Sequence, residues 1–204
     1  MERKVTLHLM MRLIHETETN EAWMTRKCKI LVDETMSLYK EVTFDDDPVL
    51  KHTYQDLKVA VHLPEPEQLI EGREILARID AGENIRGMKM VMAFNTVYLQ
   101  EAFSINPVDI LPIHAVRIGE LAIVTQPCEL YCQFGLDIKQ RSPVSSTMVV
   151  GLTEGYKGYV PTIYGVLGGG YTGVPIYHCR LEPYTGYKIV ESASRLLYNL
   201  WLTD

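Results

Sequence analysis

The sequence has few cysteines, and they are scattered along the chain. Four cysteines in 204 residues do not make the disulfide framework of a small secreted domain. The N-terminus also lacks a signal-peptide pattern, because His8 and Arg12 interrupt its apolar run and no small-residue cleavage site follows. We therefore expect reduced thiols and a cytoplasmic location.

Positive charge is in deficit. The chain has 20 Lys and Arg residues against 26 Asp and Glu residues, a formal net charge of −6. Such a chain has no basic field with which to hold a phosphate backbone, so we expect no nucleic-acid partner. Hydrophobic residues at 47% and charged residues at 23% match the average of globular proteins, which excludes a disordered chain.

The sequence has no apolar run that would cross a membrane as a helix. Its longest stretch without Lys, Arg, Asp or Glu, Gly158–Cys179, is long enough on paper but contains six glycines and two prolines. This composition is incompatible with a membrane-spanning helix, and we expect the whole stretch to be a loop.

Periodicity along the chain predicts alternating helices and strands. Helices are expected over 21–40, 66–81 and 87–99, from just after Pro127 to before Ser142, and from a capping Thr185 to the C-terminus. Strands are expected over 57–63 and 147–152, with a hairpin between them that turns at 118–120. We see no repeat or linker, and predict one α/β domain over 1–204, with a mixed β-sheet flanked by helices.

Glu129 is the first candidate site residue. It stands at the corner between a predicted strand that ends at Gln126 and the helix that follows, and α/β folds expose functional side chains at such corners. A glutamate in the first turn of a helix also complements the helix dipole, and spacing alone leaves both interpretations open.

A long loop rich in tyrosine and glycine follows the strand predicted at 147–152. Its sequence is GLTEGYKGYVPTIYGVLGGGYTG. Glycine lets a ligand approach the backbone closely, and tyrosine supplies a rigid side chain with a polar tip. A loop of this length inside a domain is typical of a functional segment.

Three segments in this order resemble the neutral/alkaline non-lysosomal ceramidase family. They are IHAVRIGELAIVTQPCE, SSTMVVGLTEGYKGYVPT and GGGYTG, with a looser match at VAVHLPEPEQLIEGREIL. The family has a strand that reads RIG, a P-G-E corner, and a later Y-x-x-Y-[IV]-x-T segment that leads to a further tyrosine. The resemblance covers roughly Leu57 to Trp201 and implies part of a larger ceramidase-like catalytic domain.

The resemblance implies a zinc-dependent hydrolase of N-acyl amide bonds, a lipid-metabolism activity directed at sphingolipids. The family holds its metal with two histidines, a glutamate and a tyrosine; the glutamate matches Glu129 and the tyrosine matches Tyr159. A tyrosine twelve positions later, used beside the scissile carbonyl, matches Tyr171. A carboxylate and a phenolate suit Zn²⁺, and a neutral phenol suits a developing oxyanion.

The chain departs from the family pattern in two ways. The middle glycine of the corner is replaced by Cys128, which would be strained if that position needed a positive φ. The family's two histidine ligands precede every matched segment, so the zinc site is expected to be incomplete without an N-terminal half. The surface that such a half would cover predicts a homo-oligomer or a partner chain, with the strand at 57–63 as the exposed edge.

Other interpretations of the sequence stay open. The chain can instead be a non-catalytic module that completes a partner or binds a small ligand through its Tyr/Gly loop, or a truncated product. His62 and His114 fit structural histidines in apolar strands. A Cys₃His set is the last alternative for a metal, although no C-x-x-C spacing supports it; it would consist of Cys128, Cys132, His178 and Cys179.

Overall fold

The computed structural model describes residues 19–169 and 171–202. Their contacts divide into two units at the Asp47–Pro48 bond. The described part of the first unit holds one helix, α2 (Asn20–Tyr39), which confirms the helix expected there. The Thr19 side chain caps α2 by accepting a hydrogen bond from the backbone N–H of Ala22 at 3.3 Å. No residue of α2 is buried.

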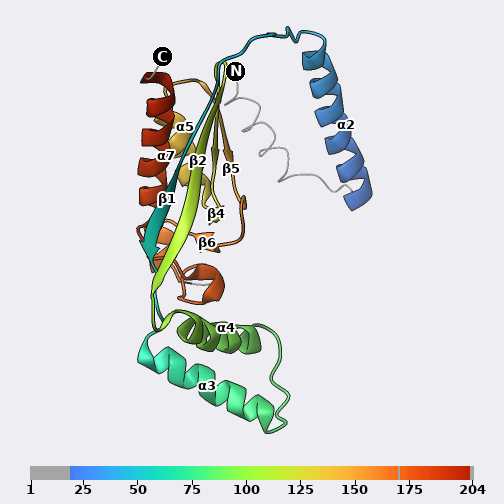
Figure 1. Cartoon of the computed structure of the whole chain (residues 1–204). Coiled ribbons are helices and arrows are strands. Elements are labelled where there is room, and N and C mark those ends of the chain that lie inside the picture. Colours follow the sequence, from blue (N-terminus) through green and yellow to red (C-terminus); the bar gives the residue numbers. More distant parts are fainter. Residues whose placement is uncertain (1–18, 170, 203–204) are drawn as a thin grey trace. The chain divides into compact units, whose positions relative to one another are not determined.

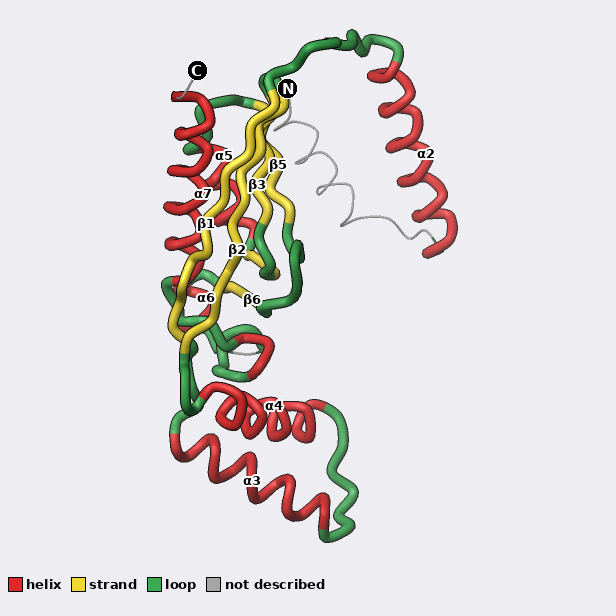
Figure 2. Tube along the Cα trace, in the orientation of Figure 1, coloured by secondary structure: helices red, strands yellow, loops and turns green. Residues whose placement is uncertain are grey.

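The second unit is built on a mixed β-sheet (Figure 2). Its strand order is β1-β2-β3-β5, with antiparallel pairing from β1 to β3 and parallel pairing between β3 and β5. The bounds are β1 Leu50–Ala60, β2 Val108–Ile118, β3 Leu121–Thr125 and β5 Ser146–Val150. The predicted fold class, a mixed sheet flanked by helices, is confirmed.

Strand β1 is longer than its sequence pattern predicts, and it lies at an edge of the sheet. It pairs with β2 in an unbroken register from Leu50↔Ile118 to Ala60↔Val108, so it begins seven residues before the expected start at Leu57. Cross-strand pairing along the whole of β2 outweighs the weak apolar alternation of the first half of β1. The predicted hairpin turn is confirmed between β2 and β3, where Gly119 has a φ of 56°.

Helices α5 (Cys132–Gln140) and α7 (Thr185–Leu202) cover one face of the sheet (Figure 1). The predicted apolar stripe of α7 is buried there, with Ala193 and Leu197 both 0% exposed. The predicted capping role of Thr185 is wrong: it is the first residue of α7, and its Oγ1 is buried without a hydrogen-bond partner. The opposite face of the sheet exposes large apolar side chains, among them Leu50, Tyr54, Ile110, Ile118 and Met148.

Helices α3 (Pro66–Asp80) and α4 (Met88–Phe103) pack against each other and follow β1 and precede β2 in the chain. Gly72 of α3 lets the two helices approach closely, because a Cβ there would lie 3.3 Å from a Val97 methyl group. Helix α4, which extends beyond the expected end at Leu99, contacts the 3-10 helix η1 (Tyr177–Cys179), with the ring of Tyr98 edge-on to that of Tyr177. The helix pair therefore supports the segment that carries His178.

The predicted continuous loop after β5 is wrong in part, because it contains short regular elements. They are β6 (Tyr159–Val160), the five-residue helix α6 (Ile163–Leu167) and η1. Glycine and proline exclude a long helix here, but not a single turn capped by Thr162. Strand β6 pairs in parallel with β4 (Glu129–Leu130), so the helix expected just after Pro127 begins only at Cys132. No helix of the described residues is long and apolar enough to cross a membrane.

Candidate functional site

The corner after β3 is braced by the side chain of Gln126. Its Oε1 accepts a hydrogen bond from the backbone N–H of Cys128 at 2.6 Å, and its Nε2 donates to the Cys128 carbonyl at 3.0 Å. Cys128 is 0% exposed, and in the described residues the only side-chain-bearing positions with a positive φ are Leu152 and Glu154. The corner therefore does not need glycine at Cys128, and the expected strain is absent.

Glu129 follows this corner and lies beside Tyr159. The two residues are register partners in the short β4–β6 ladder, and the backbone N–H of Glu129 donates to the Gly158 carbonyl at 2.9 Å. The phenol of Tyr156 donates a hydrogen bond to Oε2 of Glu129 at 3.1 Å. Two tyrosines of the YKGY segment thus flank one carboxylate.

Tyr171 and His178 complete the cluster from the end of the long loop. The ring of Tyr171 lies edge-on to Tyr159 with 5.7 Å between centroids and stacks on His178 at 4.6 Å. The His178 ring is also edge-on to Tyr159, at 6.2 Å. Glu129, Tyr159 and Tyr171, the three residues singled out from the sequence, therefore lie in one cluster, although more than forty positions separate the first from the last.

Gly158 brings the two halves of this cluster together. It has a φ of +89°, and a Cβ on it would lie 2.5 Å from the His178 carbonyl oxygen. Only glycine fits both the left-handed conformation and the contact between the two backbones. This approach fixes His178 next to the strand that carries Tyr159.

Burial and the Glu129 carboxylate shift the pKa values of three neighbouring side chains. The hydrogen bond to Glu129 raises the pKa of Tyr159 above its ordinary value. Burial and the same carboxylate raise the pKa of Tyr156 well above its usual range. Burial lowers the pKa of His178, and the nearby Glu129 offsets part of this shift. These shifts favour the neutral forms of the Tyr156 and Tyr159 phenols and of the His178 imidazole.

A buried ion pair holds the segments on both sides of the cluster. Asp109 on β2 accepts hydrogen bonds from Lys157 Nζ at 2.7 Å and from Arg180 Nε at 2.8 Å. Asp109 is 6% exposed and Arg180 is 2% exposed. Lys157 lies between Tyr156 and Tyr159, and Arg180 lies two residues after His178. Asp109 thus ties both segments to the sheet.

The donor set fits a hard or borderline metal ion only if the phenols take part. No group of three or more His, Cys, Asp or Glu side chains suited to a metal occurs in the part of the chain that the structure describes. The cluster offers one carboxylate, the phenol oxygen of Tyr159 and the Nε2 of His178, which is shielded from solvent and has no hydrogen-bond partner. Oxygen and imidazole donors of this kind suit Zn²⁺.

The alternative Cys₃His set does not form a cluster. Cys128 is buried and its pKa is raised to about 12 by burial, whereas Cys132 is exposed at the start of α5. The thiol of Cys179 donates to the Thr172 carbonyl. The three thiols therefore do not meet at one point as metal ligands.

His114, expected to be a structural histidine, lies in a second polar group on the exposed face of the sheet. Its Nδ1 is 2.9 Å from Nε2 of His52. Its Nε2 is 3.0 Å from Oε1 of Glu154, but the geometry of this contact is not that of a hydrogen bond. Glu154 has a φ of 57°, in the left-handed region. His62 lies just beyond β1, is half-buried, and joins neither group.

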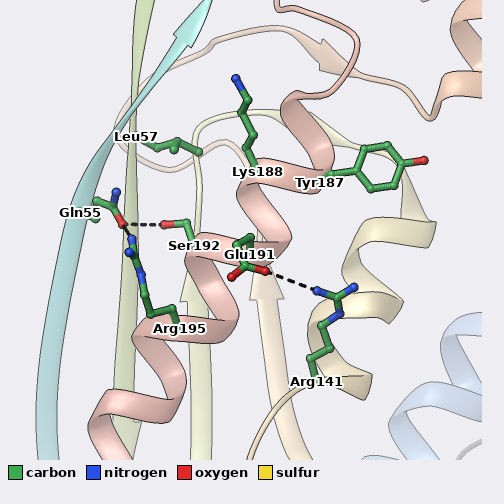
Figure 3. A pocket seen from close by; sticks show the side chains of 8 residues that line it. All are labelled: Gln55, Leu57, Arg141, Tyr187, Lys188, Glu191, Ser192 and Arg195. Carbon is green, nitrogen blue, oxygen red and sulfur yellow. Dashed lines mark hydrogen bonds and ion pairs between the residues drawn. The ribbon is translucent and has the colours of Figure 1, made fainter.

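A surface hollow of about 530 Å³ lies away from the cluster, between β1 and α7 (Figure 3). Its polar side chains bind one another: Ser192 Oγ donates to Gln55 Oε1 at 3.0 Å, and Arg195 donates to the same oxygen. Arg141 and Glu191 approach to 3.7 Å across its rim. These contacts leave no convergent set of free polar groups that would mark a site.

Sequence reasoning missed two members of the cluster, Tyr156 and His178, and the Asp109 carboxylate that holds the segments beside it. Tyr156 could have been found from its place three residues before Tyr159 in the YKGY segment. His178 was considered only together with the cysteines, because its neighbour is Cys179. Asp109 carried no signal, since its two cationic partners lie 48 and 71 positions away.

Comparison with known proteins gives matches among solved structures alone. No protein-family model matches the chain, and no curated protein matches it. The chain is similar to a ceramidase complexed with C2, at 16% identity and a TM-score of 0.44 over 76% of this chain and 30% of that chain. It is similar to neutral ceramidase from Pseudomonas aeruginosa at 17% identity and a TM-score of 0.44, over 74% of this chain and 29% of that chain. The chain thus spans less than a third of the length of either structure.

Proposed function

We propose that this chain carries part of the active site of a zinc-dependent, ceramidase-like hydrolase of N-acyl amide bonds. In this proposal Glu129 and Tyr159 are metal ligands and Tyr171 acts on the scissile carbonyl. The observation that carries the proposal is the meeting of Glu129, Tyr159 and Tyr171 from three separate segments, at 5.7 Å between the two tyrosine rings and in direct register between Glu129 and Tyr159.

The chemistry of the donors supports a metal. Glu129 supplies carboxylate oxygens, and the hydrogen bond from the Tyr156 phenol orients the carboxylate, as outer partners orient metal ligands elsewhere. Bound zinc supplies a Lewis acid for the carbonyl and activates water at neutral pH. As a zinc ligand, Tyr159 would give up its phenolic proton, so metal binding would release a proton.

Tyr171 is placed for the carbonyl side of the reaction. Its side chain is 46% exposed, so a substrate can reach it, while its ring is fixed between Tyr159 and His178. In the hydrolysis, water forms a bond to the carbonyl carbon, the C–N bond breaks, and the amine leaves with a proton from water. The Tyr171 phenol donates a hydrogen bond to the carbonyl oxygen as negative charge develops there.

The proposal covers only part of a catalytic centre. The family resemblance assigns two further histidine ligands to a segment before the matched ones, and the solved ceramidases are about three times as long as the matched region. We therefore expect slow turnover of a small N-acyl amide by this chain alone. Turnover should rise when a chain that supplies the remaining groups is added, and N-acyl sphingoid lipids are the first substrates to test.

The test is zinc binding and zinc-dependent hydrolysis by the purified 204-residue chain. We expect Glu129→Ala and Tyr159→Phe to weaken zinc binding. We expect Tyr171→Phe to slow the hydrolysis of a fluorogenic N-acyl amide without lowering the zinc affinity. Matched controls are Glu101→Ala on the exposed side of α4 and Tyr198→Phe on α7. Zinc affinity that is the same in wild type, Glu129→Ala and Tyr159→Phe would contradict the proposal. An N-acyl amide that binds without zinc and is not hydrolysed would favour the non-catalytic binding module.

A further inference from the structure

The imidazole of His178 has one nitrogen without a hydrogen-bond partner. The Nε2 of His178 is shielded from solvent and has no hydrogen-bond partner. Buried polar atoms in native proteins are almost always paired, so an unpaired imidazole nitrogen beside other donor groups is a candidate ligand. The imidazole lies against Tyr171 and Tyr159, at 4.6 Å and 6.2 Å between ring centroids.

The position of His178 is fixed from both sides. Its backbone lies against Gly158, where no side chain would fit. Its neighbour Tyr177 packs edge-on against Tyr98 of α4 at 4.8 Å, and Arg180 is bound to Asp109 at 2.8 Å. A side chain held this firmly loses little further freedom when it binds a ligand, which favours a preorganised donor.

We propose that His178 is a third zinc ligand of this site, through Nε2, beside Glu129 and Tyr159. The inference rests on the proposed function, because it assumes the metal that Glu129 and Tyr159 would hold. A neutral imidazole is among the commonest zinc ligands, and three protein ligands with one open position are the usual arrangement of a catalytic zinc.

The consequence concerns the chain by itself. The family resemblance leaves this chain with two ligands, whereas His178 gives it three, all from its own residues. The chain therefore binds one zinc ion without histidines from another polypeptide. In a longer enzyme, His178 would be a ligand additional to the two histidines that the resemblance places elsewhere.

The experiment measures metal binding by the full chain, stripped of metal with a chelator. Zinc affinity is determined by competition with a chromophoric chelator, and Co²⁺ in place of zinc reports the coordination through its visible absorption. We expect His178→Ala to weaken zinc binding at least about tenfold, since even loss of an outer partner of a ligand costs 10–100-fold. His62→Ala, a half-buried histidine outside the cluster, is the matched control and should leave the affinity unchanged.

A second readout is measured on the wild-type chain itself. In the wild-type chain labelled with ¹⁵N, zinc should shift the Nε2 resonance of His178, and His178→Gln serves to assign that resonance. An unchanged resonance at saturating zinc, or a His178→Ala chain that binds zinc as tightly as wild type, would overturn the inference. If Glu129→Ala alone abolishes binding in that case, the proposed function stands without His178; if no variant of the cluster changes binding, both fail.

Discussion

Replacement of Asp109 by asparagine should destabilise the second unit strongly, because it breaks a buried ion pair while keeping the shape of the side chain. The carboxylate is bonded to Lys157 and Arg180, and it is 6% exposed. Without it, the Arg180 guanidinium, 2% exposed, keeps a buried charge with no anion beside it. Loss of one partner of a buried pair typically costs about 3–5 kcal/mol.

The sign of the pH dependence follows from the pKa of Asp109. Burial alone would raise this pKa, but the hydrogen bond from Lys157 and the charge of Arg180 together lower it below the ordinary value of 3.8. The ionised carboxylate therefore stabilises the fold above that pH, and the contribution is lost as the pH falls through the lowered pKa. Asp109→Asn lacks the group, so its difference from wild type should shrink below about pH 4.

Urea denaturation measures this difference. With Trp23 replaced by Phe, the fluorescence of Trp201, which packs under Arg117 at 4.6 Å, reports on the second unit alone. At a slope of about 2 kcal/mol per molar urea, the expected loss moves the midpoint down by about 1.5–2.5 M. The exposed Asp56→Asn is the control and should change stability by no more than about 0.5 kcal/mol. A loss at Asp109→Asn as small as the control, or one that stays constant down to pH 3, would refute the reasoning.

Three further predictions concern the cluster, the thiols and the exposed face of the sheet. Gly158→Ala should destabilise the second unit by about 1–3 kcal/mol in urea denaturation, because alanine is strained in the left-handed conformation. It should also weaken zinc binding in a titration, because its Cβ pushes the His178 backbone away. An unchanged zinc affinity would contradict the role of Gly158 in positioning His178. A thiol reagent should modify the exposed Cys28 and Cys132 in the native chain, and the other two thiols only after unfolding, because burial raises their pKa values to about 12 and about 11. Sedimentation at micromolar concentration should show self-association that Tyr54→Lys weakens, because β1 is an edge strand and that face of the sheet is apolar; a monomeric wild type would contradict this prediction.

Elements with a strong local pattern were predictable from the sequence. The hairpin around Gly119 and the apolar stripe of α7 need only turn chemistry and a helical period. The beginning of β1 was not predictable, because its first half gains its structure from pairing with β2, more than fifty residues away. The two-residue strands β4 and β6 are too short to leave any periodicity and are held by a single ladder between distant segments.

Some residues of the candidate site were likewise predictable from the sequence, and others were not. Glu129, Tyr159 and Tyr171 came from the order and spacing of motifs that resemble a known family. Tyr156 and His178 join them through contacts that close a long loop, and such contacts leave no local signal. The glycine pattern of the family corner does not show that a side chain can brace this corner instead, as the Gln126 amide does through its two hydrogen bonds to Cys128.

The central claim is that Glu129 and Tyr159 hold a metal ion. Anomalous diffraction at the zinc absorption edge, from crystals of the chain grown with zinc, tests it directly. We predict one strong peak about 2.0–2.2 Å from a Glu129 carboxylate oxygen and from the Tyr159 phenol oxygen. Zinc peaks only at other sites, or none at saturating zinc with this pair well ordered, would contradict the claim.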